Sequence, residues 1–294
     1  MTDQPRLRPD AEIGPTLIAI GRNMLAPAAF DEPSDAAAIH AFRRAMKRWR
    51  SFLRLLQPLL GEEALRLRHE ARDLARKLAS ARDAQAALDA LADLEGDYAP
   101  LSPTATNTLR TRIEALRSAA ESMSLTADAR EDLRAVLART IDAVEHWPLQ
   151  QATFHDVAVG LAEGYRRARG AMPSDWSAVA AEDLHAFRQR VVVHRYQMEL
   201  AEPLWPRLGR MWVGEAQRLR ERLGKHQDLA VLAGLLAPKA PLARWRSRLL
   251  PAIEARQRDH IEAAMRLSGR LFAERPKAFQ RRLEALWESR AGRS

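Results

Sequence analysis

The sequence predicts an all-α protein, and three observations carry that prediction. Alanine, leucine, arginine and glutamate dominate the 294 residues, glycine occurs only 13 times, and apolar residues recur at spacings of three and four. Such composition and periodicity favour helices throughout the chain. No segment argues convincingly for a strand.

Turn-forming residues divide the chain into roughly ten or more expected helices. The breaks are expected at residues 27–34, at Pro58 and Gly61, around residues 97–103, at Pro148, at residues 170–175, and at Pro203 and Pro206. One helix is expected from Ile39 to Leu60, with its N-terminal cap near Ser34 or Asp35.

An internal repeat gives the domain organisation. His40-Ala41-Phe42-Arg43 returns as His185-Ala186-Phe187-Arg188, an offset of 185 − 40 = 145. The same offset relates Arg50 to Arg195, Pro58-Leu59 to Pro203-Leu204, and Leu78 and Asp83 to Leu223 and Asp228. One unbroken register over about forty residues indicates a repeated helix–turn–helix unit. We therefore expect two homologous halves, residues 1–150 and residues 151–294.

Charge and composition narrow the classes of function. Lysine and arginine total 47 against 38 acidic residues, and the formal charge of +9 indicates an anionic partner or surface. The absence of cysteine excludes disulfides, thiolate metal sites and thiol nucleophiles. The apolar stretch at residues 13–21 is too short to span a bilayer, and Asp3 and Asp10 argue against a signal peptide. We expect a cytoplasmic protein with no transmembrane segment.

The expected helix from Ile39 to Leu60 separates into two faces when it is turned by about 100° per residue. The buried stripe comprises Ile39, Phe42, Met46, Trp49, Leu53 and Leu56. The opposite face carries His40, Arg43, Arg44, Lys47, Arg48, Arg50 and Arg54, and no carboxylate follows until Glu62. A single basic face is usually a solvated surface, but recurrence of the His-x-x-Arg pattern favours a binding face. Guanidinium groups suit phosphate because they make paired hydrogen bonds to its oxygens.

These motifs resemble those of the CHAD family, the conserved histidine α-helical domain. The resemblance rests on the two histidine helices and on a second motif, which is Leu78-Ala79-Ser80-Ala81-Arg82-Asp83 in one half and Leu223-Gly224-Lys225-His226-Gln227-Asp228 in the other. It implies two four-helix-bundle-like halves related by pseudo-two-fold symmetry around a basic cleft or pore. It also implies binding of inorganic polyphosphate, often on polyphosphate granules.

The resemblance also implies a set of phosphate-binding residues. These are His40, Arg43, Arg44, Lys47, Arg48, Arg50, His185, Arg188 and Arg195, with Arg72, Arg82 and Lys225 as weaker candidates, and Arg54 shares their face. The second half departs from the family pattern at Gln189, Val192 and Val193. The first half is therefore expected to be the principal surface.

Three other functions are weighed against this one. A general polyanion-binding or nucleic-acid-binding protein is the alternative, although most of the seven tryptophans read as packing residues. Catalysis is not expected, because no zinc-protease, phosphate-loop or nucleophile-elbow motif occurs.

Asp83 and Asp228 are weak metal-ligand candidates, and no metal or cofactor is expected. The C-terminal segment at residues 266–290 alternates Leu, Phe and Trp with arginine, a pattern that fits self-association or binding to an anionic surface, while the sequence specifies no oligomeric state.

Overall fold

The computed structural model describes residues 6–8, 10–26, 35–77, 82–95, 98, 100–121 and 127–291. Regular structure in these residues is entirely helical, as predicted. The α-helices are α1 (Ile13–Leu25), α2 (Asp35–Leu60), α3 (Glu62–Lys77), α4 (Arg82–Asp93), α5 (Pro103–Glu121), α6 (Ala127–Glu145), α7 (Phe154–Gly170), α8 (Ala181–Ala201), α9 (Pro206–Leu235), α10 (Arg246–Leu271) and α11 (Pro276–Ala291). Two 3-10 helices, η2 (Glu202–Leu204) and η3 (Ala243–Trp245), precede α9 and α10 respectively.

Most of the expected helix breaks are present, with one difference. Pro58 lies inside α2, which continues to Leu60, and Gly61 with a φ of 52° ends the helix. A proline in the last turn removes only one hydrogen bond, whereas the left-handed backbone at Gly61 cannot continue a helix. Pro206 begins α9, as a proline in the first helical turn commonly does. The expected break at residues 27–34 and the Ser34 cap lie outside the described residues.

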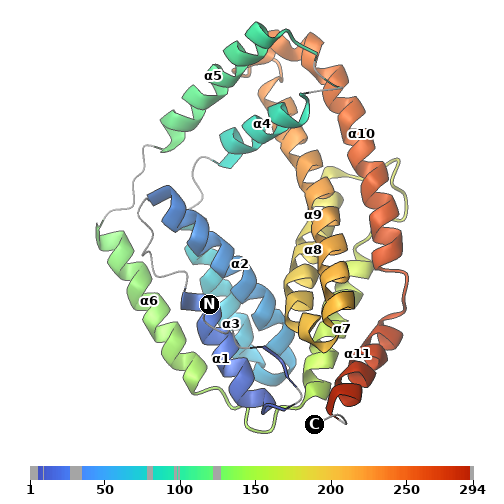
Figure 1. Cartoon of the computed structure of the whole chain (residues 1–294). Helices are drawn as coiled ribbons and strands as arrows, with labels where there is room; N and C mark the ends of the chain where they lie inside the picture. The colour runs from blue at the N-terminus through green and yellow to red at the C-terminus, as the bar shows by residue number, and fades with distance from the viewer. Residues whose placement is uncertain are drawn as a thin grey trace.

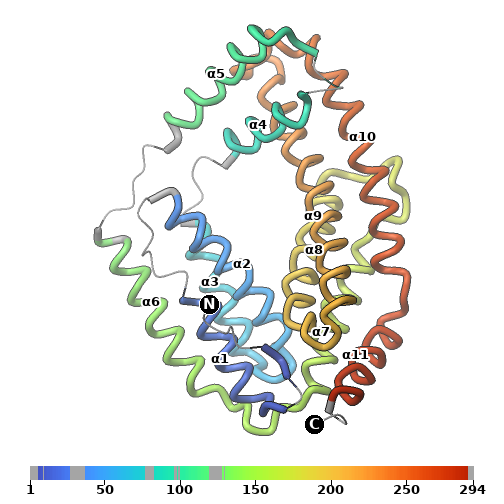
Figure 2. Tube along the Cα trace, viewed as in Figure 1, coloured from blue at the N-terminus to red at the C-terminus, as the bar shows by residue number. Residues whose placement is uncertain are grey.

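Two helices, α2 and α9, are central to the packing, and most of the other helices contact one of them. α2 packs against α1, α3, α7 and α8, while α9 packs against α8, α10 and α4. Figures 1 and 2 both show α4 and α5 beside α9 and α10, well away from α2 and α3. The first-half helices α4 and α5 therefore belong spatially with the last part of the chain.

Two hydrophobic cores hold this arrangement. The larger core joins α1, α2, α3 and α6 to α7, α8, α11 and parts of α9 and α10. The smaller core joins α4 and α5 to the end of α9 and the start of α10, through residues such as Leu91, Ile113, Leu232 and Leu249. Each core draws on residues from before and after residue 150.

The buried stripe of α2 matches its prediction. Phe42, Met46, Trp49, Leu53 and Leu56 are each at most 2% exposed, and Ile39 packs half-buried against the same core. Burying this stripe against α1, α3 and α7 leaves the basic residues of α2 on its remaining sides, some exposed and some half-buried against neighbouring helices.

A close approach of α7 to α8 sets the geometry beside that basic face. Thr153 and Asp156 form a capping box at the start of α7, so the helix has a defined first turn. A Cβ atom at Gly164 would lie 1.9 Å from the side-chain oxygen of Gln197 on α8. Glycine leaves room here for the end of the Gln197 side chain, in the middle of α7, which packs against both α8 and α2.

Candidate anion-binding site

The predicted basic residues of α2 divide between two sides of the helix. His40, Arg44 and Lys47 are exposed, whereas Arg43, Arg48, Arg50 and Arg54 are half-buried. Arg50 and Arg54 turn towards α3, α7 and α8, because their pKa values respond to charges on those helices. Arg44 and Arg48 instead line a pocket beside α1, α8 and α9.

Five guanidinium groups gather where α2, α3, α7 and α8 meet, and we call Arg50, Arg54, Arg68, Arg167 and Arg190 the arginine cluster. Burial, and after it the charges of the other four members, together lower the pKa of Arg54 to about 10. The pKa of Arg68 is lowered by burial and by Arg167, Arg50 and Arg190. These mutual effects show like charges held close together in a partly desolvated place.

The charge of the arginine cluster is only partly compensated. Arg68 donates to the side-chain oxygen of Gln57 at 2.7 Å, and Arg167 donates to Glu163 at 2.5 Å. Across the part of the chain that the structure describes, no carboxylate forms an ion pair with Arg50, Arg54 or Arg190. Repulsion of this kind favours a bound anion.

Arg72 and Arg76 extend the arginine cluster along α3. Both lower the pKa of Arg50, after the larger effect of burial. Each also lies near Asp73, at 3.3 Å and 3.8 Å respectively, in exposed positions where ion pairs contribute little. The side chain of Arg82 lies outside the described residues, as do residues 78–81 of its motif.

Arg195, the repeat partner of Arg50, lies elsewhere. It pairs with Glu199 at 2.5 Å, and Arg48 reaches the other oxygen of the same carboxylate at 3.7 Å. Both arginines line the pocket that also contains Arg44. The structure therefore separates Arg44, Arg48 and Arg195 from the arginine cluster.

The second histidine helix contacts the second motif of its own half. Arg188 donates to the side-chain oxygen of Gln227 at 3.0 Å. A Cβ atom at Gly224 would lie 3.3 Å from the guanidinium of Arg188, so the glycine leaves room for that group. His185 lies 2.6 Å from Gln189. These contacts join the two predicted motifs in space and hold Arg188 along α9.

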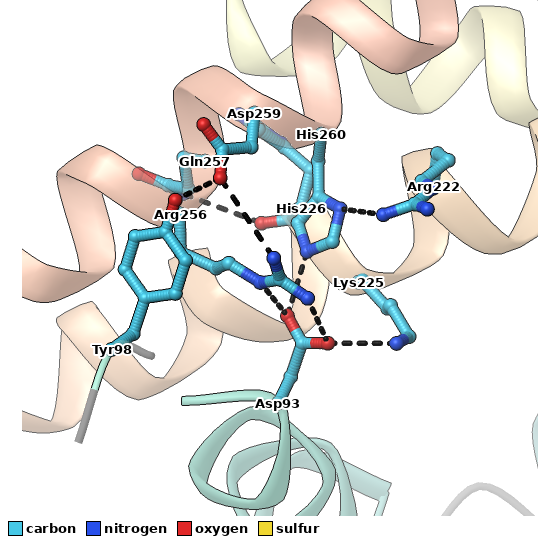
Figure 3. A network of polar contacts seen from close by, with 9 residues as sticks. All are labelled: Asp93, Tyr98, Arg222, Lys225, His226, Arg256, Gln257, Asp259 and His260. Carbon is cyan, nitrogen blue, oxygen red and sulfur yellow. Dashed lines mark hydrogen bonds and ion pairs between the residues drawn. The ribbon is translucent and has the colours of Figure 1, made fainter. Parts of the chain in front are cut away.

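Lys225 belongs to a different network, centred on Asp93 at the end of α4 (Figure 3). Asp93 is 4% exposed and accepts hydrogen bonds from Lys225 at 2.7 Å, from His260 at 2.6 Å and from Arg256 at 3.0 Å. Burial alone would raise the pKa of Asp93, but these three donors hold it well below its usual range. Lys225 is thus an anchor for α4 and does not join the arginine cluster.

Sequence reasoning left four basic residues out of the candidate list. Arg68, Arg76 and Arg167 were visible as basic rows, but such rows are more often ordinary surface. Arg190 has no basic counterpart in the first half, since 190 − 145 = 45 and residue 45 is alanine. Only the crossing of α2, α7 and α8 brings these side chains together.

Among the described residues there is no group of three or more His, Cys, Asp or Glu side chains that could hold a metal ion. Asp83 lies in the first turn of α4, which is a favourable place for an acidic residue. Within the same residues, no helix has the length and apolar character needed to cross a membrane.

Comparisons with known proteins agree with this fold. The sequence model of the CHAD domain family matches residues 25–237. The comparison with curated proteins gave no match. Among solved structures, the chain is similar to the crystal structure of the CHAD domain from the plant Ricinus communis, with 20% identity, coverage of 96% of this chain and 95% of that chain, and a TM-score of 0.56. At this level of identity the likeness supports the fold alone.

Proposed function

The chain belongs to the CHAD domain family, and from that premise we propose that it binds inorganic polyphosphate without catalysing a reaction. The observation that carries the proposal is the arginine cluster itself, in which guanidinium groups from four helices gather and, among the described residues, Arg50, Arg54 and Arg190 form no ion pair with a carboxylate. A pKa of about 10 still leaves Arg54 charged at neutral pH. The cluster therefore holds a high positive charge density that a polyanion would neutralise.

Phosphate is the anion that suits these side chains best. A guanidinium group offers parallel N–H donors that match two phosphate oxygens, and the cluster contains five such groups from four helices. A linear phosphate polymer can contact several guanidinium groups at once, whereas a single phosphate reaches only a few. His40, Arg43 and Lys47 continue the basic face along α2 and would guide further phosphates towards the cluster.

The proposal includes the two-half organisation with a basic cleft between the halves. Element positions support it, because adding 145 to α1 (Ile13–Leu25) gives 158–170 within α7, and adding 145 to α5 (Pro103–Glu121) gives 248–266 within α10. The same shift relates α2 to α8 and α6 to α11. α2 and α3 come from one half and α7 and α8 from the other, so polyphosphate at the arginine cluster would contact both.

We further propose that the protein acts in the cytoplasm, in association with polyphosphate granules. The first half would supply most of the affinity, because Val192 and Val193 stand on α8 where the repeat places Lys47 and Arg48 on α2. Valine side chains donate no hydrogen bonds to phosphate.

A competition assay tests the proposal. Long-chain polyphosphate, duplex DNA and single-stranded RNA would compete for the purified protein at matched, near-physiological ionic strength. We expect polyphosphate to displace the others at a far lower concentration of phosphate units. Equal competition by all three would instead indicate a general polyanion-binding protein, since counterion release draws basic surfaces to any phosphate backbone.

Two matched variants locate the site. The triple variant Arg50→Gln, Arg54→Gln and Arg68→Gln should lose affinity for polyphosphate by at least about tenfold and show a shallower salt dependence. The control variant replaces the exposed Arg112, Arg248 and Arg258 of α5 and α10 by glutamine, which removes the same net charge. Equal losses in the two variants would refute a site at the arginine cluster.

A further inference from the structure

A pocket lies between α1, α2, α8 and α9, on the side of α2 that carries Arg44 and Arg48. Its volume of about 630 Å³ falls within the usual range for small-molecule sites. By contrast, the enclosed space beside Arg54, Arg167 and Arg190 is only about 20 Å³, so a polyanion at the arginine cluster would lie across its surface and not inside a cavity.

The arginines that line the pocket carry more positive charge than the neighbouring carboxylates neutralise. Arg44, Arg48, Arg195 and Arg210 contribute to this charge, and Arg48 and Arg195 share the single carboxylate of Glu199. Each of these four arginines carries several N–H donors, and phosphate oxygens would accept hydrogen bonds from those that face the space.

Apolar side chains and one aromatic ring also line the pocket. Ile20 and Met24 of α1, Leu200 of α8 and Val213 of α9 are among them. Tyr196 lines the pocket as well, and the Arg195 guanidinium lies 4.2 Å from the centre of its ring. A mixed lining of this kind suits a ligand that has a flat, partly apolar group beside its charged part, because that group is buried against side chains of similar polarity.

The internal repeat shows how this pocket differs from the arginine cluster. The offset of 145 relates Arg54 to Glu199, Arg68 to Val213, and Ala45 to Arg190. Equivalent positions thus carry arginine at the cluster but glutamate, valine and alanine at the pocket. The pocket therefore has fewer like charges than the arginine cluster and a lining that is partly polar and partly apolar. It fits a different ligand from the cluster.

We infer that this pocket binds a nucleoside polyphosphate. The phosphates would contact Arg44, Arg48, Arg195 and Arg210, and the nucleoside would contact the apolar and aromatic side chains of the lining. This ligand class goes beyond inorganic polyphosphate, which has no apolar part, and does not depend on the function proposed for the arginine cluster. Glu202, which also lines the pocket, offers an acceptor for hydroxyl or amino groups of the nucleoside.

Calorimetry with three probes tests the inference. ATP, inorganic tripolyphosphate and adenosine would each be titrated into the full chain at the same ionic strength. We expect ATP to bind at least tenfold more tightly than tripolyphosphate, because only ATP contacts both the arginines and the apolar side chains of the pocket. Equal affinity for ATP and tripolyphosphate, or no binding of ATP, would overturn the inference.

Two variants decide where ATP binds. Arg44→Gln with Arg210→Gln changes two exposed residues and is expected to keep the fold, as circular dichroism would check, while weakening ATP binding at least tenfold. Arg54→Gln with Arg68→Gln at the arginine cluster should leave ATP binding unchanged while weakening polyphosphate binding. The reverse pattern for ATP would place it at the arginine cluster and refute the pocket, and failure of polyphosphate binding alone would refute only the proposed function.

Discussion

Arg54 is the residue at which stability and binding oppose each other. Burial and four like charges lower its pKa well below the usual value for arginine, to about 10, so the folded state holds its proton less tightly than the unfolded state does. The resulting destabilisation is present at every pH below 10 and disappears as pH rises from there towards the pKa of the unfolded state. At neutral pH the ligand-free protein is therefore less stable than it would be without this charge.

Replacing Arg54 by methionine should raise the stability of the ligand-free protein at pH 7 by about 1 kcal/mol. This value is smaller than the pKa shift alone implies, because solvent screens a partly exposed group. Urea unfolding measures the gain, and the same variant should bind polyphosphate more weakly. Arg112→Met on α5 serves as the control and should change neither property. A clear loss of stability in Arg54→Met would contradict strain within the arginine cluster.

His194 makes stability depend on acid. It is completely buried, accepts a hydrogen bond from the indole N–H of Trp212 at 2.9 Å, and packs beside Tyr165 and Phe272. Burial lowers its pKa from 6.5 to about 3. Between these pH values the histidine is protonated in the unfolded state and neutral in the folded state. Stability should fall as pH decreases from 6.5 to 3, by up to about 1.4 kcal/mol per pH unit.

The variant His194→Gln separates this effect from other titrations. Glutamine keeps an acceptor for Trp212 but does not titrate, so the decline in unfolding free energy between pH 6.5 and 4.5 should be less steep than in the parent protein. Urea unfolding at several pH values provides the comparison. Parallel declines in both proteins would mean that His194 is not a source of acid sensitivity.

Sequence reasoning reached the basic face of α2 but not the full arginine cluster. Arg50 and Arg54 were identified because helical periodicity places them opposite Trp49 and Leu53. Arg190 is not predicted as a binding residue, because valines follow it on α8 and the equivalent residue of the repeat is Ala45. Periodicity specifies which face of a helix a residue occupies, whereas the angle at which helices cross decides which faces meet.

At the level of elements, Asp93 fastens α4 to α9 and α10. Its carboxylate lies among donors from both helices, and the pKa held below its usual range keeps it charged at neutral pH. This contribution to stability is present above the unfolded pKa of about 3.8 and is lost only in stronger acid. Tyr98 adds a hydrogen bond to Asp259 beside this network (Figure 3).

Replacing Asp93 by alanine should destabilise the protein by about 3 kcal/mol, because the buried His260 and the half-buried Arg256 would lose their common partner. Hydrogen exchange should accelerate most in α4 and α5, which have few contacts beyond the smaller core. Asp89→Ala on an exposed turn of α4 is the control and should have little effect. Unchanged exchange in α4 would show that apolar packing alone holds the helix in place.

The repeat predicts the order of helices better than their ends. Pro58 and Pro203 are equivalent, yet α2 runs through Pro58, whereas α8 ends at Ala201 and Pro203 lies in a 3-10 helix. The second half contains a further proline, Pro206, and the residue before it is extended, with φ −149° and ψ 89° at Trp205. A residue before proline avoids the helical region, which explains the sharper break.

At the scale of the whole molecule, neither residues 1–150 nor residues 151–294 have a hydrophobic core of their own among the described residues. The smaller core combines α4 and α5 with parts of α9 and α10, and the larger core combines α2 with α7 and α8. The sequence indicated two repeats through one offset, but it contained no information about which repeat each helix packs against. Long-range packing of this kind depends on the shapes of both partners, so a pattern within one helix does not specify it.

Binding of polyphosphate at the arginine cluster should therefore stabilise the molecule as one unit. The cluster joins α2 and α3 to α7 and α8, and a ligand that binds only the folded state adds about 2.7 kcal/mol at a concentration of 100 times its Kd. For a chain of this size the midpoint of thermal unfolding should rise by about 5 °C or more. Calorimetry should show a single shifted transition, because neutralising the cluster relieves repulsion across both halves.

Chain length and the triple variant make this expectation specific. Monophosphate at the same concentration of phosphate units should produce a much smaller shift, since it cannot connect guanidinium groups on different helices. The variant Arg50→Gln, Arg54→Gln and Arg68→Gln should respond to polyphosphate hardly at all, whereas the control with Arg112, Arg248 and Arg258 replaced should respond like the parent protein. Equal stabilisation by monophosphate and long-chain polyphosphate would show that the cluster binds isolated anions and does not join the two halves through one ligand.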